Sequence, residues 1–419
     1  MSHYKPYPAY KDSGVAWLGD VPAHWNVKKL KWLASLQSGD FITSESIKAE
    51  GEYPVFGGNG SRGYTEAFTH DGRYALIGRQ GALCGNINYS EGKFWASEHA
   101  VVVLPSEQVN TTWLGELLRT MNLNQYSVSS AQPGLAVERI TDLYVPVPPI
   151  DEQEEISKLL EGETVHIDGL ISKKTRFIDL LREKRQALIT YAVTKGLDPD
   201  VKMKDSGVEW LGEVPVHWQV KRLRYIVNLN PTVKKDLMHD ADVSFLPMEA
   251  IGTDGSINLK KTRTVADVRN GYSYFEDGDV AFAKVTPCFE NGKGAVMRGL
   301  VGGIGFGTTE LTVLRPNPDI DVNFINYLLQ SDRFRLLGAG AMTGAGGLKR
   351  VPDEFTRNFE APCPIFTEQE LIANYLMNKT ARIDNMIAKS ERSIELLKER
   401  RSALITAAVT GQIDLRQAA

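Results

Sequence analysis

The chain has 419 residues, 42% of them hydrophobic and 24% charged, which suits roughly two to four globular domains and excludes a disordered tail. It has no apolar run of about eighteen residues and no export signal at its start, so we expect a cytoplasmic protein that does not contact membranes. The three cysteines fit neither a disulfide framework nor a zinc motif, and no metal is expected. With a formal net charge of -4, nucleic-acid binding would depend on local basic patches.

The sequence contains an internal duplication. DSGVAWLGDVPAHWNVKKLKW begins at Asp12 and returns as DSGVEWLGEVPVHWQVKRLRY from Asp205, an offset of 193 residues. A second pair of blocks places Glu152 opposite Glu368, an offset of 216, so the second copy has 23 extra residues (216 less 193) between its blocks. Chance does not produce two such matches. Each copy therefore has a fixed opening segment, a divergent middle and a fixed helix at its end.

The two divergent middles run roughly over residues 34–149 and 227–364. They are rich in glycine, asparagine and aromatic residues. Short apolar runs lie between their turn signals: YALIG, AVVVLP, DVAFAKV and LTVLRP. Ser97-Glu98 and Thr309-Glu310 precede such runs in the same way. We expect two mixed α/β domains that share one frame and differ in content.

The blocks that end each copy carry apolar residues in alternating steps of four and three. These seam residues are Leu160, Ile167, Ile171, Ile178, Leu181 and Leu188 in the first block and Leu376, Ile383, Ile387, Ile394, Leu397 and Leu404 in the second. A repeat of 3.5 residues is typical of coiled-coil packing. About forty helical residues at ~1.5 Å each make a rod of roughly 60 Å. Chain order favours an antiparallel pair, in which the second helix returns toward the first domain.

The expected fold class is α+β. Two mixed α/β domains are separated by two long helices, which pair within the chain as an antiparallel coiled coil, and the whole is a tandem repeat with pseudo-twofold symmetry. The predicted parts are a first domain over 1–150, a spacer helix over 151–196, a second domain over 197–366, a second spacer helix over 367–410 and a C-terminal tail over 411–419.

Several repeated motifs resemble one protein family. The DSGVxWLGxVPxHW segments, PPIDEQ and PIFTEQE before the helices, and KRQALITYAVT and RRSALITAAVT at their ends resemble conserved regions of the specificity subunits of type I restriction-modification systems. The resemblance covers nearly the whole chain. It implies that each middle is a target-recognition domain that binds one half of a bipartite sequence in double-stranded DNA. The helices would set the gap between the halves and dock two modification (methyltransferase) subunits.

The same resemblance implies that this chain is not an enzyme. It would bind no cofactor itself: S-adenosylmethionine belongs to the modification subunits, and ATP and Mg belong to restriction subunits that join the complex. The residues agree, because the sequence has no Asn/Asp-Pro-Pro-aromatic methyltransferase motif and no GxxxxGK[ST] phosphate loop. No catalytic residue is predicted.

Candidate DNA-contacting residues are polar side chains near predicted loops. Asn and Arg are the usual readers of adenine and guanine edges, although phosphate contact or solvation is expected more often than base readout. The candidates are Asn59, Arg62, Tyr64, Arg79, Gln80 and Gln132 in the first middle and Lys284, Thr286, Asn291, Lys293, Lys349 and Arg350 in the second. Basic clusters within 28–31, 221–224 and 260–263 are either phosphate contacts or solvated faces.

One glycine-rich string, Gly58–Gly63, has the GxGxxG pattern. It does not lead into a helix and has no acidic residue about twenty positions on, which argues against a dinucleotide cradle. Two interpretations stay open with equal weight. The string is either a loop that presents Asn59, Arg62 and Tyr64 to DNA or an ordinary surface loop.

The repeated His24-Trp25 and His217-Trp218 pairs invite a catalytic interpretation. The pattern suggests no Ser, Cys or carboxylate partner for them, so packing is favoured. Glu152 and Glu368 are expected to be charges in the first helical turn that favour the helix dipole. For the basic residues at the far ends of the helices, contact with the modification subunit, with the other helix or with water remain alternatives.

Two rival functions remain. A fused nuclease or methyltransferase would cleave or methylate DNA as the purified chain. A coiled-coil adaptor without a nucleic-acid role is favoured by the net charge of -4. Duplex binding by the complex that weakens steeply with salt would exclude the adaptor.

Overall fold

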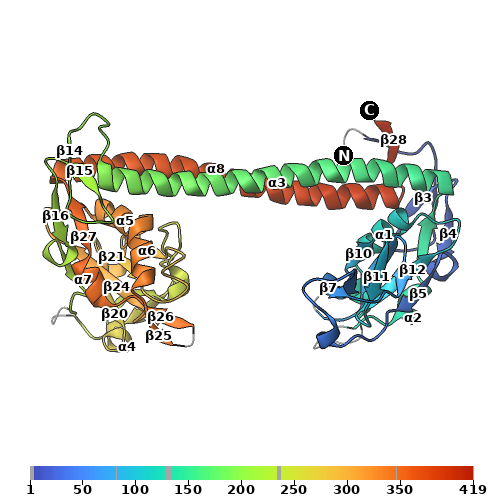
Figure 1. Cartoon of the computed structure of the whole chain (residues 1–419), viewed down its shortest axis with the longest axis horizontal. Coiled ribbons are helices and arrows are strands. Elements are labelled where there is room, and N and C mark those ends of the chain that lie inside the picture. Colours follow the sequence, from blue (N-terminus) through green and yellow to red (C-terminus); the bar gives the residue numbers. More distant parts are fainter. Residues whose placement is uncertain (1–3, 82, 128–133, 234–236, 346, 419) are drawn as a thin grey trace. The chain divides into compact units, whose positions relative to one another are not determined.

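The structure is a computed structural model that describes residues 4–81, 83–127, 134–233, 237–345 and 347–418. The chain divides into two compact units (Figure 1). Unit 1 comprises Met1–Thr175 and Glu391–Ala419, and unit 2 comprises Arg176–Ser390. Each unit contains strands and short helices together with a part of both long helices, α3 (Ile150–Lys195) and α8 (Phe366–Val409). The prediction of mixed α/β structure is confirmed. Within the described ranges, no helix combines the length and apolar character needed to cross a membrane.

Unit 1 is built on two four-stranded sheets. The first, in spatial order β10-β9-β12-β5, contains β5 (Ala34–Ser38), β9 (Tyr74–Gly78), β10 (Ile87–Ser90) and β12 (Ala100–Pro105). The second, in spatial order β7-β6-β11-β8, contains β6 (Tyr53–Gly57), β7 (Gly60–Thr65), β8 (His70–Asp71) and β11 (Lys93–Ala96). The predicted runs YALIG and AVVVLP are β9 and β12. They are neighbours in the first sheet and largely buried, which explains why these runs are apolar throughout.

Smaller elements complete unit 1. Its two-stranded pairs are β1 (Tyr4–Lys5) with β28 (Asp414–Ala418), β2 (Tyr10–Asp12) with β3 (Asp20–Pro22), and β4 (Asn26–Lys29) with β13 (Tyr144–Val147). Its short helices are α1 (Thr111–Thr120), α2 (Val137–Thr141) and the 3-10 turns η1 (Leu30–Trp32), η2 (Ser44–Ser46) and η3 (Leu123–Tyr126). The predicted tail is thus paired with the first strand of the chain.

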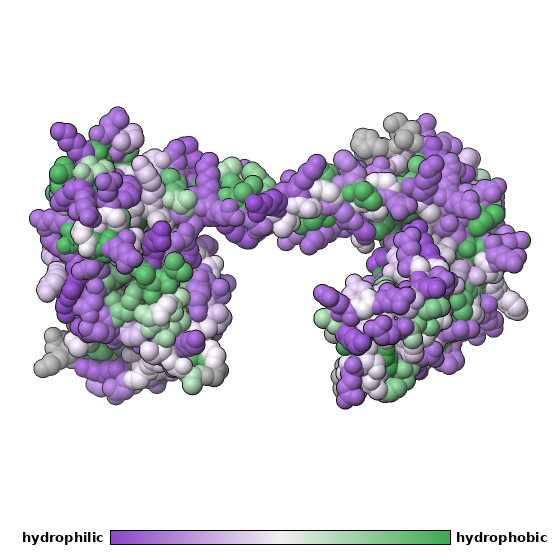
Figure 2. Space-filling model, in the orientation of Figure 1, coloured by the Kyte–Doolittle hydropathy of each residue, from purple (hydrophilic) through white to green (hydrophobic). Residues whose placement is uncertain are grey.

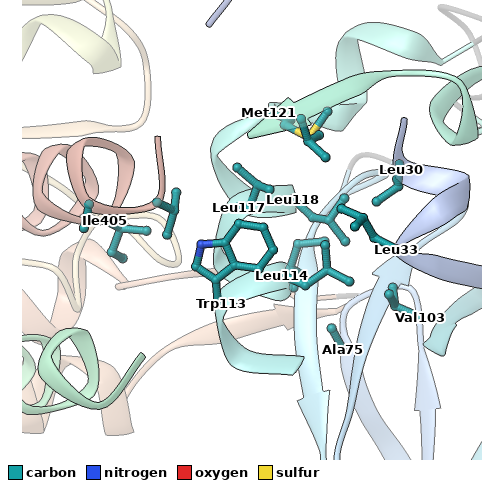
Figure 3. Packing of buried hydrophobic residues seen from close by; sticks show 14 of the residues in the cluster. Leu30, Leu33, Ala75, Val103, Trp113, Leu114, Leu117, Leu118, Met121 and Ile405 are labelled. Carbon is teal, nitrogen blue, oxygen red and sulfur yellow. The ribbon is translucent and has the colours of Figure 1, made fainter. Parts of the chain in front are cut away.

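The core of unit 1 joins the first sheet, α1 and the long helices. Trp113, which is fully buried, and Leu117 of α1 lie between sheet residues such as Ala75 and the α8 residue Ile405 (Figure 3). The Asn110 side chain caps α1 by accepting a hydrogen bond from the Trp113 N–H at 2.9 Å. The domain and the adjoining helix segments therefore share one hydrophobic core.

Unit 2 repeats this plan with different strands. One sheet, in spatial order β17-β24-β21-β22, contains β17 (Val227–Leu229), β21 (Val280–Ala283), β22 (Gly294–Val296) and β24 (Leu311–Pro316). The other, in spatial order β19-β18-β23-β20, contains β18 (Asp242–Leu246), β19 (Thr262–Thr264), β20 (Ser273–Glu276) and β23 (Ile304–Gly307). The strand pairs are β14 (Met203–Asp205) with β15 (Glu213–Pro215), β16 (Gln219–Arg222) with β27 (Glu360–Cys363), and β25 (Thr343–Ala345) with β26 (Leu348–Arg350).

The helices of unit 2 are α4 (Val265–Val268), α5 (Val322–Gln330), α6 (Asp332–Gly340), α7 (Asp353–Asn358) and the 3-10 turns η4 (Leu223–Tyr225), η5 (Met248–Ala250) and η6 (Val301–Gly303). Of these, α5 packs on β21 and β22 of the first sheet, and α4 packs on β19 of the second. Asp321 caps α5 as Asn110 caps α1, by accepting from the Phe324 N–H at 2.8 Å. Phe324 is buried in one cluster with Leu314 of β24 and Leu376 of α8, so this domain also packs on its helix segments.

Within each unit, α3 and α8 contact one another. In unit 1 the Arg401 Nε lies 3.0 Å from Asp168 Oδ1, and in unit 2 the Arg185 Nε lies 2.9 Å from Asp384 Oδ1. Of the three alternatives for the basic residues at the helix ends, contact with the opposite long helix is therefore observed for Arg401 of α8 and for Arg185 of α3. The predicted seam residues that are buried are Leu160, Ile167, Ile178, Leu181, Leu376, Ile383 and Leu404, and those that are half-buried are Ile171, Leu188, Ile387, Ile394 and Leu397.

The Arg185–Asp384 pair offers a test of this helix contact. We expect Arg185→Glu to lower the free energy of unfolding by about 1 kcal/mol, because it places two like charges side by side. The double variant with Asp384→Arg should regain at least half of that loss in urea titrations. Lys389→Glu, which changes an exposed charge on α8, serves as the control and should have little effect. A double variant no more stable than Arg185→Glu would contradict the pairing.

Candidate nucleic-acid interface

Each unit contains the same contact between its opening segment and the first turn of a long helix. Trp25 and Trp218 are fully buried. The neighbouring His24 Nε2 lies 2.8 Å from a carboxylate oxygen of Glu152, and His217 Nε2 lies 2.9 Å from Glu368. The sequence pattern suggested no carboxylate partner, because these glutamates lie more than a hundred residues from the histidines in sequence. The tryptophans do pack in the core, as expected.

In unit 1 this contact is part of a larger buried network. Glu152 also accepts a hydrogen bond from Trp25 Nε1 at 3.2 Å and forms an ion pair with Arg416 Nη2 at 3.2 Å. Arg416 in turn binds Asp414, which is 2% exposed. The network ties β28 to the start of α3. Unit 2 differs, since the Trp218 Nε1 is buried without a hydrogen-bond partner in the described part of the chain.

Three predicted DNA-contacting residues of unit 1 lie near the end of β9. Arg79 Nη1 donates to Ser38 Oγ at 3.1 Å, and Gln80 Oε1 lies 3.0 Å from His99 Nδ1. Asn59 Oδ1 accepts from Asn86 Nδ2 at 3.0 Å. The turn that carries Asn59 reaches this group because the backbones meet closely: a Cβ on Gly78 would lie 2.2 Å from the Gly58 carbonyl oxygen.

Sequence reasoning missed the partners in this group, Ser38, Asn86 and His99. Asn86 and His99 precede β10 and β12, the two neighbours of β9, and Ser38 ends β5 on the far side of β12, so only strand pairing brings them to the predicted residues. Of these three residues, only His99 could have been found from sequence, because it directly follows the repeated Ser97-Glu98 string. The group is a polar surface with amide, imidazole and guanidinium side chains, which suits hydrogen bonding to base edges or phosphates.

The glycine-rich string forms the turn and part of the second strand of a β-hairpin: Gly58 and Asn59 lie in the turn, and the rest of the string is in β7. β6 ends at Gly57 and β7 begins at Gly60, so Arg62 and Tyr64 lie on a strand. Arg62 is exposed, and Tyr64 is 39% exposed. Tyr64 is held by backbone hydrogen bonds to Lys48. Gln132, the remaining candidate of the first middle, lies outside the described residues.

Four candidates of unit 2 come together beside the β25–β26 hairpin. The Thr286 N–H donates to the Lys349 carbonyl at 2.9 Å, and the Val351 N–H donates to the Lys284 carbonyl at 2.8 Å. Arg350 forms a two-point ion pair with Glu310, in which Nε and Nη2 bind the two carboxylate oxygens at 2.8 and 2.6 Å. The guanidinium lowers the pKa of Glu310.

Asn291 and Lys293 were predicted on an exposed loop. Asn291 is exposed, but Lys293 is half-buried and its Nζ donates to the Met248 carbonyl at 3.0 Å. Its ammonium group is thus satisfied by a backbone acceptor within unit 2. Among the candidates of the second middle, Lys293 is the one that the structure assigns most clearly to internal packing.

The basic clusters contain several charges that are already paired. Lys29 and Lys31 lie 3.3 and 2.7 Å from Asp142, and these ammonium groups lower the pKa of its carboxyl. Lys261 lies 3.2 Å from Glu249, and Arg263 stacks over the Phe245 ring at 4.2 Å. Local acids therefore neutralise part of the positive potential that the sequence suggested.

No group of three or more His, Cys, Asp or Glu side chains is arranged to hold a metal ion among the described residues. Burial raises the pKa of the Cys84 and Cys363 thiols, which disfavours the reactive thiolate. The interface candidates are hydrogen-bonding and cationic side chains.

This chain is similar in sequence to known specificity subunits of type I restriction-modification systems. A family model described as the type I restriction modification DNA specificity domain matches residues 22–164. The EcoprrI specificity subunit of Escherichia coli is 42% identical over 161 residues, which are 38% of this chain and 40% of that protein. The EcoAI subunit of Escherichia coli is 40% identical over 189 residues, 44% of this chain and 31% of the relative. The chain thus spans less than half the length of these relatives.

Other relatives align over greater lengths at lower identity. The putative MjaX specificity subunit of Methanocaldococcus jannaschii is 23% identical, with 95% of this chain and 96% of that protein covered. A solved chain from a type I restriction-modification system has a TM-score of 0.66 at 13% identity, covering 93% of this chain and 98% of its own length. The HsdS subunit of Thermoanaerobacter tengcongensis has a TM-score of 0.51 at 15% identity, with 94% and 98% covered. The solved structures support the fold, and the sequence matches show that residues 22–164 are similar to the DNA specificity domain of type I restriction-modification systems.

Proposed function

We propose that this chain is the DNA-recognition subunit of a type I restriction-modification complex and performs no chemistry itself. Each target-recognition domain, over 1–150 and 197–366, binds one half of a bipartite target. The helices over 151–196 and 367–410 pair as an antiparallel coiled coil, set the gap between the halves and dock two modification subunits. Those subunits bring S-adenosylmethionine, and restriction subunits bring ATP and Mg.

One observation carries this proposal: two units with the same internal frame present different polar surfaces. The frame is the repeated contact of His24 with Glu152 and of His217 with Glu368. The surfaces differ, because Arg79 and Gln80 meet Ser38 and His99 in unit 1, whereas Arg350 meets Glu310 in unit 2. A repeated scaffold with unlike surfaces suits an asymmetric ligand with two different sites.

The long helices carry apolar side chains that point away from the seam. Leu159 and Tyr375, which are 216 positions apart and hence equivalent in the two copies, are each 36% exposed. Leu180 and Leu396, another equivalent pair, are 46% and 50% exposed. Hydrophobic residues interrupt the hydrophilic surface of the helices in Figure 2. Exposed apolar residues at repeated positions favour binding of a similar partner to each copy.

Methylome sequencing tests the proposal directly. Host cells that carry this chain and its modification subunit should show methylated adenines in one bipartite, asymmetric sequence with a constant gap. Cells in which the gene for this chain is deleted should lose methylation at that sequence. Methylation that persists without the chain, or that follows a continuous target, would contradict the assignment.

A domain exchange supplies a sharper prediction. When residues 34–149 are replaced by the corresponding middle of another specificity subunit, we expect one half of the target to change completely. The other half and the gap should stay the same, because residues 227–364 and the helices are untouched. Methylome sequencing of cells with the exchanged chain measures all three features. A change in both halves would show that the middles do not act separately.

A further inference from the structure

The pairing of Arg350 with Glu310 is the feature of unit 2 that best defines a specific chemistry. Arg350 ends β26, on the exposed β25–β26 hairpin. Its backbone is fixed on both sides, since it pairs with Thr343 in the hairpin and forms a bridge to Val285 just after β21. Its side chain is fixed as well, through the two hydrogen bonds to the Glu310 carboxylate. These contacts hold a long side chain in one conformation, so its conformational entropy is lost before any ligand binds.

The N–H donors of Arg350 that Glu310 does not bind remain available to a ligand. A guanidinium has five N–H donors, and the carboxylate takes those of Nε and Nη2 on one edge of the group. Among the residues that the structure describes, none bonds to the other edge, which is formed by Nη1 and the second N–H of Nη2. The Arg350 side chain is 44% exposed, so solvent reaches this group. Two parallel donors at this spacing match the O6 and N7 acceptors that guanine presents in the major groove.

We propose that Arg350, oriented by Glu310, reads a guanine in the half of the DNA target that unit 2 recognises. This proposal rests on the proposed function, because it requires unit 2 to bind duplex DNA. Glu310 is a positioning residue here: it holds the guanidinium plane in place before binding, so less conformational entropy is lost when the base is bound. A two-stranded ribbon such as β25–β26 also fits the width of the major groove.

Glu98 of unit 1 occupies the sequence position that corresponds to Glu310 of unit 2, but it pairs with a histidine and not with an arginine. Glu98 precedes β12 as Glu310 precedes β24, but its Oε1 lies 3.2 Å from the His99 Nε2. An imidazole offers one or two single donors and cannot form the two-point contact of a guanidinium. Guanine readout through this acid is therefore expected in the unit 2 half alone, and Glu98→Gln is a control that should leave that half unaffected.

The test uses the complex of the full chain with its modification subunit and a duplex that contains the methylated target. Each guanine in the unit 2 half is replaced in turn by 7-deazaguanine, which lacks the N7 acceptor. At one position we expect binding by the unchanged complex to weaken by about tenfold. Arg350→Ala should weaken binding to the normal duplex similarly and show no further loss with 7-deazaguanine.

Three variants separate base readout from simple charge or loss of folding. Lys349→Ala removes a cation from the same strand and should keep the full effect of 7-deazaguanine. Arg350→Lys keeps the charge, so loss of guanine discrimination in this variant cannot be a charge effect. Glu310→Gln should keep folding, as judged by circular dichroism, while discrimination at that guanine falls by several-fold.

Several outcomes would overturn the proposal. One is a unit 2 half without guanine, and another is Arg350→Ala retaining the 7-deazaguanine effect at every position. A third is an equal loss on all duplexes with a reduced salt dependence, as for a phosphate contact. If the wild-type complex binds its bipartite target but any of these three outcomes is found, only the assignment of Arg350 to a guanine fails. If it binds no such target, the proposed function fails.

Discussion

Replacing Ile167 by aspartate should unfold the helix region of unit 1 and prevent assembly with the modification subunit. Ile167 is 2% exposed and belongs to the same buried cluster as Leu404 and Ile405 of α8. The substitution removes apolar contacts and places a carboxylate among buried apolar side chains. We expect the free energy of unfolding to fall by at least about 4 kcal/mol, at the upper end of single substitutions.

Urea unfolding of the chain and co-purification with the modification subunit measure this effect. Val165→Asp is a matched control, because Val165 lies two positions away on the same helix and is 66% exposed. It should change stability by less than about 0.5 kcal/mol. Ile171→Asp should fall between the two, since Ile171 is half-buried. Unchanged assembly of the Ile167→Asp chain would show that this seam residue is not needed for the helix contact.

The parts of the fold that were predictable from sequence depend on local patterns or on self-similarity. The apolar run YALIG forms β9 because its residues are buried on both faces of a central strand, and such a run is visible without knowledge of its neighbours. The string Gly58–Gly63 was predicted to be a loop because its strand character depends on a neighbouring strand and is not visible in the string itself. Residues 60–63 of the string form part of β7 only by pairing with β6, and glycine-rich residues give no apolar alternation that would reveal a strand.

The candidate interface was less predictable, because its key contacts join residues distant in sequence. Glu310 and Arg350 were each noted separately, but their ion pair spans forty residues and depends on how the hairpin meets β21. His24 and Glu152 lie still further apart. A signal for that contact existed: the histidine and the glutamate are both repeated in the second copy, as His217 and Glu368. Residues that are duplicated together are candidates for contact with each other.

The repeated His–Glu contact also yields the second large prediction, which compares the two copies. Glu152 has a side chain only 6% exposed, and it binds His24, Trp25 and Arg416 at once. In Glu152→Gln the ion pair with Arg416 is lost inside a poorly solvated site, and an amide cannot accept at both oxygen positions. We expect the free energy of unfolding to fall by about 2–3 kcal/mol.

Glu368→Gln is the matched control in unit 2. The Glu368 side chain is 26% exposed, and His217 is its one ion-pair partner within the described residues. Loss of that contact should cost no more than about 1 kcal/mol. Hydrogen–deuterium exchange adds a local readout. In Glu152→Gln, protection should fall in β28 and β1, because Arg416 no longer ties the C-terminal strand to the start of α3, whereas in Glu368→Gln these strands should exchange as in the unchanged chain. Equal effects of the two substitutions would mean that the Arg416 contact adds nothing, and that the C-terminal strand is held by its backbone pairing with β1 alone.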